Sequence, residues 1–232
     1  MKKNIVILTG AGISAESGIS TFRDANGLWK NHRMEDVASP IAWDNDMDLV
    51  LEFYNIRRKQ LFKVKPNKGH KALVNLEKYF NTQIITQNVD DLHERAGSSK
   101  ILHLHGELKK VRSTTNSQLI YKMDQWELKR GDLCEQGSQL RPHIVWFGEA
   151  VPELGKAIEI MQQAEILVII GTSLVVYPAA SLMDYVKPET PVFYMDPQAE
   201  RLSHKTNIVC IAQKAAEGLP KLVEELINKY GE

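Results

Sequence analysis

The sequence predicts an α/β fold: a Rossmann-like, doubly wound parallel sheet with a smaller lobe formed by two insertions. Two observations predict this class. Continuous apolar runs such as Ile5–Leu8 and Ile166–Ile170 alternate along the chain with segments of helical spacing, as in parallel sheets whose two faces are covered by helices. The first run also leads directly into the glycine-rich turn Gly10-Ala11-Gly12 and a helix start. This order of strand, turn and helix is the phosphate-cradling arrangement of dinucleotide-binding folds.

The other elements follow from apolar spacing and turn residues. We expect strands at 5–8, 83–86, 101–105, 143–147, 166–170, 192–195 and 208–211. Helices are expected over about 46–63, from the typical N-cap Asn67 onwards, and over 92–96, 152–164 and 178–186. The last helix carries apolar residues at 219, 222, 223, 226, 227 and 230, which is the 3.6-residue spacing of one buried face.

Two insertions define the predicted domain organisation. The chain is expected to form one domain, residues 1–232. A standard nucleotide-binding unit returns to its second strand within about 30 residues, but here that strand begins only at 83. A second polar stretch interrupts the pattern later. The core therefore takes about 1–30, 71–106 and 143–232, and the small lobe about 31–70 and 107–142.

Charge and hydropathy exclude several kinds of protein. Lys plus Arg number 29 and Asp plus Glu number 29, so the formal net charge is +0, which disfavours a nucleic-acid binder that relies on bulk positive charge. No apolar run approaches the roughly 20 residues of a membrane span, and the first strand begins too early for a signal peptide. We expect a cytoplasmic protein with neither nucleic acid nor membrane as a partner. Its oligomeric state stays open.

Ligands of such sheets bind beyond the carboxyl ends of the strands. Gly10, Gln87, His105, Gly148 and Gly171 all fall at the carboxyl ends of expected strands. The strand ends therefore predict a ligand site. A histidine at such a site can serve as a general base, because the ordinary pKa of imidazole is ~6.5. The alternative is a buried histidine satisfied by a backbone carbonyl, and His103 fits that role better than His105.

Five segments carry a family resemblance: Gly10–Trp29, Thr86–Gly97, Leu104–Leu108, Pro142–Glu149 and Gly171–Pro178. In this order, and over nearly the whole chain, they resemble the motifs of the sirtuins, the NAD-dependent protein-lysine deacylases. The resemblance implies NAD as the cofactor and acyl-lysine proteins or peptides as the substrates. It implies release of nicotinamide and 2′-O-acyl-ADP-ribose.

The resemblance also implies roles for single residues. His105 is implied as the catalytic base on the ribose hydroxyls, with Asn88 beside it. Phe22 and Arg23 resemble a pair that shields the reacting ribose from water. Tyr194 stands where the family commonly carries Asn. The residues implied to bind NAD are Gly10, Ala11, Gly12, Ser14, Ala15, Phe22, Arg23, Trp29, Gln87, Asn88, Asp90, Gly171, Thr172, Ser173, Tyr194, Met195, Asp196 and Ala215.

The segment from Val145 to Glu149 resembles the strand that pairs with the substrate peptide. Such pairing gives affinity through the backbone with little demand on the peptide sequence. The residues implied to bind substrate there are Val145, Phe147, Gly148 and Glu149. The alternative is an ordinary core strand.

Tyr54 and Arg57 indicate the kind of acyl group. They lie three residues apart, on one face of an expected helix, and Arg57 interrupts an apolar stripe. A guanidinium there favours a carboxylate, which takes two parallel hydrogen bonds. Tyr54-x-x-Arg57 also resembles the signature of the bacterial sirtuin branch that removes succinyl and malonyl groups, and Ala15 is small, as in that branch. The alternative is that Arg57 extends to solvent and Tyr54 packs.

The chain departs from the family in its second insertion. Most sirtuins carry four zinc-binding cysteines there, whereas residues 107–141 contain only Cys134 and no histidine. A structural zinc needs four ligands, so we predict no zinc and no other metal site. The lobe would instead be held by Leu119, Ile120, Tyr121, Trp126 and Leu128. Two further functions stay open: a protein mono-ADP-ribosyltransferase, against which His105 argues, and a non-catalytic NAD-binding module.

Overall fold

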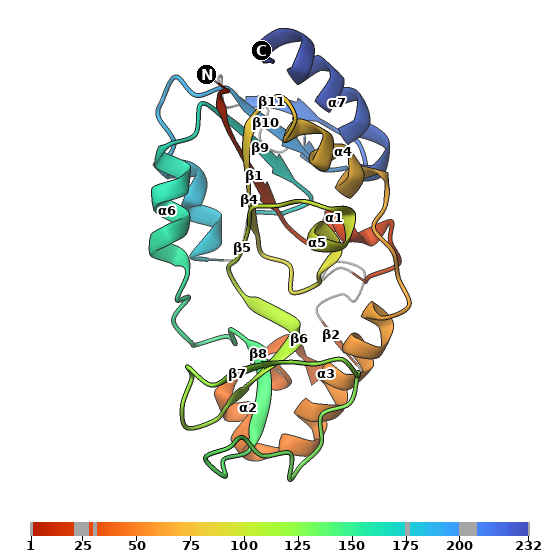
Figure 1. Ribbon diagram of the computed structural model, residues 1–232, viewed down its shortest axis with the longest axis vertical. Helices are drawn as coiled ribbons and strands as arrows, with labels where there is room; N and C mark the ends of the chain where they lie inside the picture. The colour runs from red at the N-terminus through yellow and green to blue at the C-terminus, as the bar shows by residue number, and fades with distance from the viewer. Residues whose placement is uncertain (1, 21–27, 30–31, 175–176, 200–207, 232) are drawn as a thin grey trace.

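The computed structural model describes residues 2–20, 28–29, 32–174, 177–199 and 208–231. A parallel sheet of six strands forms the larger part of the molecule (Figure 1). Its order is β11 (Ile208–Ile211), β10 (Val192–Met195), β9 (Ile166–Ile170), β1 (Asn4–Thr9), β4 (Asn81–Thr86) and β5 (Ile101–His103). The predicted doubly wound α/β fold is confirmed.

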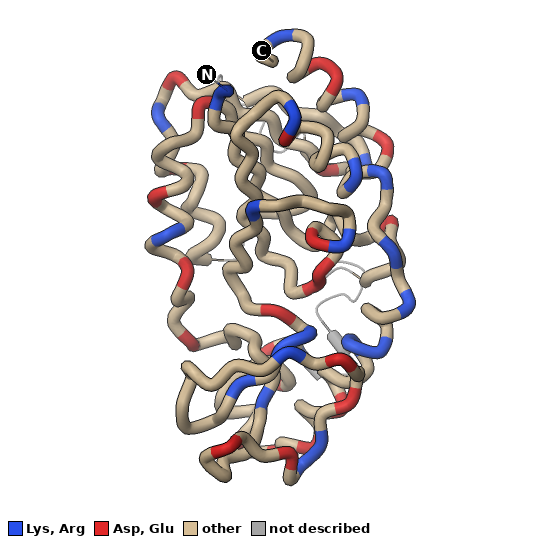
Figure 2. Tube along the Cα trace, viewed as in Figure 1, with Lys and Arg blue, Asp and Glu red and all other residues tan. Residues whose placement is uncertain are grey.

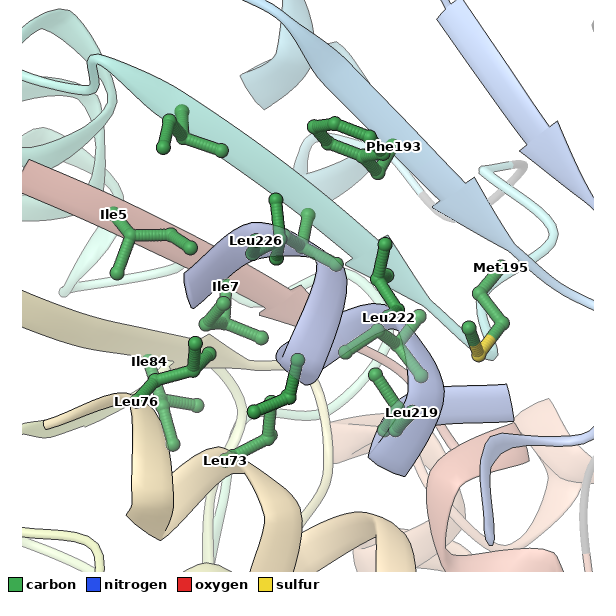
Figure 3. Packing of buried hydrophobic residues seen from close by; sticks show 14 of the residues in the cluster. Ile5, Ile7, Leu73, Leu76, Ile84, Phe193, Met195, Leu219, Leu222 and Leu226 are labelled. Atoms are coloured by element: carbon green, nitrogen blue, oxygen red, sulfur yellow. The ribbon is translucent and has the colours of Figure 1, made fainter. Parts of the chain in front are cut away.

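The two faces of this sheet bury alternate residues of each strand. Ile5 and Ile7 of β1 point to one face, against α4 (Lys68–Leu76) and α7 (Ala215–Tyr230). Figure 3 shows this core, in which Leu73 and Leu222 meet the strands. The intervening Val6 and Leu8 point to the other face, covered by α6 (Leu154–Gln162) and the 3₁₀ helix η2 (Ala179–Tyr185). Continuous apolar runs are required because both faces are covered.

A second, antiparallel sheet lies at the opposite end of the molecule from α7 (Figure 1). Its order is β7 (Ile120–Lys122), β6 (Gly106–Ser113) and β8 (Leu140–Ile144). It packs with α2 (Pro40–Asn45) and α3 (Met47–Leu61) around a separate apolar cluster. The short elements β2 (Leu28–Trp29), β3 (His32–Arg33) and η1 (Met34–Asp36) precede α2, and α1 (Gly12–Ala15) and α5 (Leu92–Ala96) follow β1 and β4.

The helix starts match their sequence signals. Asn67, the predicted N-cap, accepts hydrogen bonds from Gly69 N and His70 N. Ser39 and Asp46 cap α2 and α3 in the same way, so these three helices begin where a side chain replaces a missing backbone acceptor. Lys and Arg alternate with Asp and Glu over both parts of the molecule (Figure 2).

Two expected elements differ from the structure. The strand expected at 143–147 ends at Ile144 and belongs to the small sheet, because Trp146 N bonds to Glu149 Oε2 and Phe147 N bonds to Ala38 O instead of continuing a ladder. Gly148 therefore does not follow a strand of the large sheet. The helix expected at 178–186 is 3₁₀, and the second insertion contains β7 and most of β6.

Among the described helices, none is long and apolar enough to cross a membrane.

Candidate active site

The loops after β1 and β9 touch through their glycines. Gly12 N donates to Gly171 O at 2.8 Å, and Gly171 has a φ of +59°. A Cβ atom on Gly12 would lie 2.5 Å from the Cα of Gly171, and one on Gly10 would lie 2.7 Å from the Cβ of Thr172. Only glycine allows this approach. The contact brings the carboxyl ends of two neighbouring strands into one site.

A buried polar cluster joins this turn to the loop after β4. Ser14 Oγ donates to Asp90 Oδ2 at 2.9 Å and accepts from Asn88 Nδ2 at 3.1 Å. All three side chains are buried. Burial raises the pKa of Asp90, although hydrogen bonds from Leu92 N and Ser14 Oγ oppose that shift. The structure therefore brings together three residues that the sequence assigned to two distant motifs.

Four further buried residues, which the sequence did not indicate, contact this cluster or one another: Thr9, Thr86, His70 and His93. Thr9 Oγ1 donates to Thr86 Oγ1 at 2.8 Å and lies 3.1 Å from His93 Nε2. His70 and His93 are fully buried, with ring centroids 5.1 Å apart, and His70 Nε2 lies 3.5 Å from Ser14 Oγ. Burial lowers the pKa of His70 to about 4 and that of His93 well below its usual value. Both imidazoles are therefore neutral at pH 7. Both histidines lie within helices that the sequence predicted. That placement was the only indication in the sequence that they could be buried.

His105 lies two residues beyond β5, and its ring orientation is defined. Its Nδ1 is 3.1 Å from the carbonyl oxygen of Gln87. A carbonyl only accepts, so Nδ1 carries the proton and Nε2 keeps its lone pair. Nε2 bonds to no described residue. Burial lowers the pKa of His105, and the Gln87 carbonyl offsets this only in part. The ring is therefore a neutral base at pH 7, with one nitrogen free.

The neighbouring histidine has a different environment. His103 Nδ1 lies 3.0 Å from Asn88 O, and its Nε2 lies 2.7 Å from Glu94 Oε1. Burial lowers the pKa of His103, but the hydrogen bond and charge of Glu94 raise it more, so that the net pKa lies above its usual value. Both nitrogens are occupied. Both histidines therefore contact a backbone carbonyl, and they differ in that His103 Nε2 also has a carboxylate partner.

The residues on the β9 and β10 side form the rest of the candidate site. Thr172 Oγ1 accepts from Gln87 Nε2 at 3.0 Å, and Thr172 O accepts from the Tyr194 hydroxyl at 2.9 Å. Ser173 is half-buried beside them, and buried Asp196 follows β10. Tyr194 therefore supports the Thr172 loop from within the core.

Other predicted residues lie elsewhere. The side chains of Met195 and Ala215 belong to the apolar core. Ala11 is the N-cap of α1 and Ala15 is its last residue. Trp29 belongs to β2. The predicted pair Phe22 and Arg23 lies outside the described residues.

Tyr54 and Arg57 lie on α3, where an acyl pocket was expected. Tyr54 is buried, and its Oη accepts a hydrogen bond from Trp146 Nε1 at 3.0 Å. Arg57 is half-buried, with its Cζ 5.2 Å from the ring centroid of Phe53. No hydrogen bond or ion pair joins Arg57 to another described residue. Burial lowers the pKa of Arg57, and the charges of Tyr54 and Asp90 oppose this shift.

Glu149 has no free carboxylate oxygen. Its two oxygens bond to Arg141 at 2.7 and 3.1 Å, to Arg112 at 3.1 and 3.3 Å, and to Trp146 N at 2.7 Å. Burial raises the pKa of Glu149, but the hydrogen bonds and charges of its partners lower it more, so the net shift is downward. Glu149 holds the segment from 145 to 149 in place.

The small lobe has its own packing. Of the residues expected to hold it, Leu128 is buried and Tyr121 packs against the cluster, but Ile120 is 44% exposed because it points away on the outer strand β7. The sequence analysis missed Arg58, which is fully buried and donates to Leu108 O, Asn55 Oδ1 and Trp126 O. Within the described ranges, no group of three or more His, Cys, Asp and Glu side chains is placed to hold a metal ion.

This sheet, with a glycine turn and convergent polar residues at its strand ends, defines an α/β nucleotide-binding protein. The Sir2 family profile matches residues 10–178, and the chain belongs to this family, as the five motifs predicted. The chain is 56% identical over 226 residues to the NAD-dependent protein deacylase of Helicobacter pylori, with coverage of 97% of this chain and 98% of the relative.

Two solved structures extend the comparison. A Sir2 homologue in complex with NAD has a TM-score of 0.89 and 39% identity, and the match covers 99% of this chain and 91% of that chain. A Sir2 protein bound to acetylated peptide has a TM-score of 0.80 and 27% identity, and the match covers 97% of this chain and 93% of that chain.

Proposed function

We propose that this chain is an NAD-dependent protein-lysine deacylase that prefers succinyl and malonyl groups. The observation that carries the reaction is the neutral imidazole of His105, whose Nδ1 is bound to Gln87 O and whose Nε2 bonds to none of the described residues. The residues around it fit NAD. Hydroxyl, amide and carboxyl groups of Ser14, Asn88 and Asp90 converge there, and such groups match ribose hydroxyls and a carboxamide.

When bound, NAD supplies the ribose carbon that accepts the acyl oxygen and that releases nicotinamide. Gln87, Asn88 and Asp90 would hold the ribose and nicotinamide end, and Thr172, Ser173 and Asp196 the adenosine end. His105 would take a proton from a ribose hydroxyl at Nε2. The Gln87 carbonyl keeps the ring in the tautomer that this step requires, and it stabilises the charged ring that results.

The acidic acyl preference rests on Arg57. The Arg57 guanidinium is half-buried over the Phe53 ring, and among the described residues no hydrogen bond compensates for the burial of its charge. A succinyl or malonyl carboxylate provides that compensation through two hydrogen bonds. The Tyr54 hydroxyl accepts from Trp146, so its own proton remains for the same carboxylate. An acetyl group offers neither interaction.

The substrate peptide would bind along 145–149. The amides of Val145 and Phe147 are occupied by His105 O and Ala38 O. The amide of Gly148 bonds to no described residue, and Phe147 is 40% exposed. A peptide would therefore find one backbone donor and one apolar surface beside His105, which requires little of the peptide sequence.

Mass spectrometry of acyl-peptides tests the proposal. Succinyl-, malonyl- and acetyl-lysine peptides of one sequence are incubated with and without NAD. We expect NAD-dependent loss of each acyl group, with succinyl removed at the highest kcat/KM. Retention of every acyl group would refute the deacylase. Transfer of labelled ADP-ribose to protein that survives His105→Ala would favour the transferase instead.

Arg57→Met tests the acyl pocket. Loss of one charge-assisted, bidentate interaction is expected to lower succinyl kcat/KM by about 10- to 100-fold, with a much smaller change for acetyl. Lys63→Met is the matched control, because Lys63 is an exposed residue just beyond α3. Equal losses on both substrates would remove Arg57 from acyl recognition.

We also propose that the small lobe folds without zinc. Its apolar cluster and the bonds of Arg58 connect α3 to β6 and to the loop at Trp126. Elemental analysis of purified protein is expected to find no zinc, and dialysis against a chelator is expected to leave activity unchanged. Stoichiometric zinc would contradict this proposal.

A further inference from the structure

The indole of Trp146 determines how the Tyr54 hydroxyl is oriented. Trp146 Nε1 lies 3.0 Å from Tyr54 Oη, and the side chains are 2% and 3% exposed. An indole N–H only donates, so the direction of this hydrogen bond is certain. The Tyr54 hydroxyl acts as the acceptor, and its own proton must point to another acceptor.

No described residue accepts that proton, because the Tyr54 hydroxyl makes no other hydrogen bond in the described part of the chain. Arg57 lies on the same helix, three residues further on, and is close enough for its charge to act on Tyr54. The Tyr54 hydroxyl proton and the Arg57 guanidinium, neither of which has a hydrogen-bond acceptor among the described residues, therefore lie one helical turn apart on α3. Together they match a single carboxylate.

Trp146 is itself fixed in place on two sides. The Arg141 guanidinium stacks on its ring, with Cζ 3.3 Å from the ring centroid, and the Trp146 amide donates to Glu149 Oε2 at 2.7 Å. Arg141 also bonds to Glu149, which accepts from Arg112 as well. These arginines lie on β8 and β6. The small sheet therefore holds the indole at Tyr54.

We propose that Trp146 is a specificity-determining positioning residue, whose N–H occupies a lone pair of the Tyr54 hydroxyl so that this hydroxyl presents its proton to the distal carboxylate of the acyl group. The inference rests on the proposed preference for acidic acyl groups. Accepting a hydrogen bond also polarises the Tyr54 O–H and strengthens its donation. An acetyl group has no distal carboxylate, so the effect is confined to succinyl and malonyl substrates.

A double-mutant cycle tests the inference. Trp146→Phe keeps a ring and removes the N–H, and Tyr54→Phe removes the hydroxyl. The ratio of succinyl to acetyl kcat/KM is measured for wild type, both single variants and the double variant. Trp146→Phe is expected to lower the ratio by about 10-fold, the effect of one hydrogen bond to a charged group. In the Tyr54→Phe background it is expected to change nothing further.

Trp43→Phe is the matched control, because Trp43 is buried in the same cluster, 5.6 Å from Trp146, and makes no hydrogen bond to Tyr54. It is expected to leave the ratio unchanged. General loosening of the lobe by Trp146→Phe would lower both activities and leave the ratio unmoved, and this result would overturn the inference.

Two other outcomes separate the proposals. In the first, wild type removes succinyl, but Trp146→Phe lowers the ratio of succinyl to acetyl kcat/KM by the same factor with and without the Tyr54 hydroxyl. This result would refute the role of Trp146 and leave the acyl preference standing. If wild type removes acetyl and not succinyl, the acyl preference fails, and the role of Trp146 fails with it.

Discussion

The Nδ1 atom of His105 lies 3.1 Å from the carbonyl oxygen of Gln87, the residue that directly follows β4. The loop that carries the predicted nicotinamide contacts therefore also selects the tautomer of the predicted base. A shift of this loop would turn the ring as well. Cofactor binding and base orientation depend on one backbone segment.

Replacement of His105 is expected to abolish most turnover. His105→Ala should lower kcat for deacylation by about 10²- to 10⁴-fold, the usual contribution of a positioned general base. The assay is peptide deacylation at saturating NAD. His103→Ala provides the contrast, since both of its nitrogens are occupied and it lacks a free base position. A His105→Ala enzyme with more than a third of wild-type kcat would contradict the assignment.

Gly12→Ala is expected to disrupt the contact between the β1 and β9 loops. The added Cβ would lie 2.5 Å from the Cα of Gly171, which is backbone and has no free rotamer to adopt. Overpacking of this kind costs about 1–3 kcal/mol of unfolding free energy. Urea unfolding measures the loss, and NAD titration by calorimetry should show weaker binding. Gly155→Ala is the control, because no atom of the described residues lies within 4 Å of its Cβ position.

Stability is expected to fall as the medium becomes acidic. Burial lowers the pKa of His70 to about 4, below the ~6.5 of an unfolded chain. The unfolded state therefore binds a proton first, so the contribution of His70 is complete above about pH 6.5 and is lost as the pH falls toward 4. His93 acts in the same direction.

Urea unfolding between pH 7.5 and 4.5 measures this slope. Each histidine contributes at most about 1.4 kcal/mol per pH unit. In a stable His70→Gln variant, unfolding should take up one proton fewer. The unfolding free energy should therefore change less steeply with pH. An unchanged slope in that variant would show that His70 does not titrate on unfolding.

Arg58 is expected to hold the small lobe together. Arg58→Met removes the donors to Leu108 O and Trp126 O and leaves a buried acceptor at Leu108 and a partly buried one at Trp126. Unsatisfied buried acceptors cost about 1–3 kcal/mol each, so the unfolding free energy should fall by at least that amount. Arg130→Met is the control, since its ion pair with Asp48 is largely exposed and such pairs contribute little. Equal stability of the two variants would refute this role.

The sequence by itself determined the parallel sheet, the glycine turn and the family. Burial of a strand on two faces requires a continuous apolar run, such as Ile166–Ile170. Close approach of two backbones requires glycine, as in the Gly10-Ala11-Gly12 turn. Both features can be recognised from a few consecutive residues. His105 was singled out by the family resemblance of Leu104–Leu108, and the strand expected to include it ends at His103.

Only the tertiary structure decided which side chains meet. Trp146 and Tyr54 are 92 residues apart, and Ser14 and His70 are 56 apart. It also showed that Glu149 faces Arg141 and Arg112, and that the apolar run after Ile144 leaves the strand. These contacts join residues that are distant in the sequence, so they depend on how the elements that carry them pack together. The spacing of residues within one element does not predict such a contact.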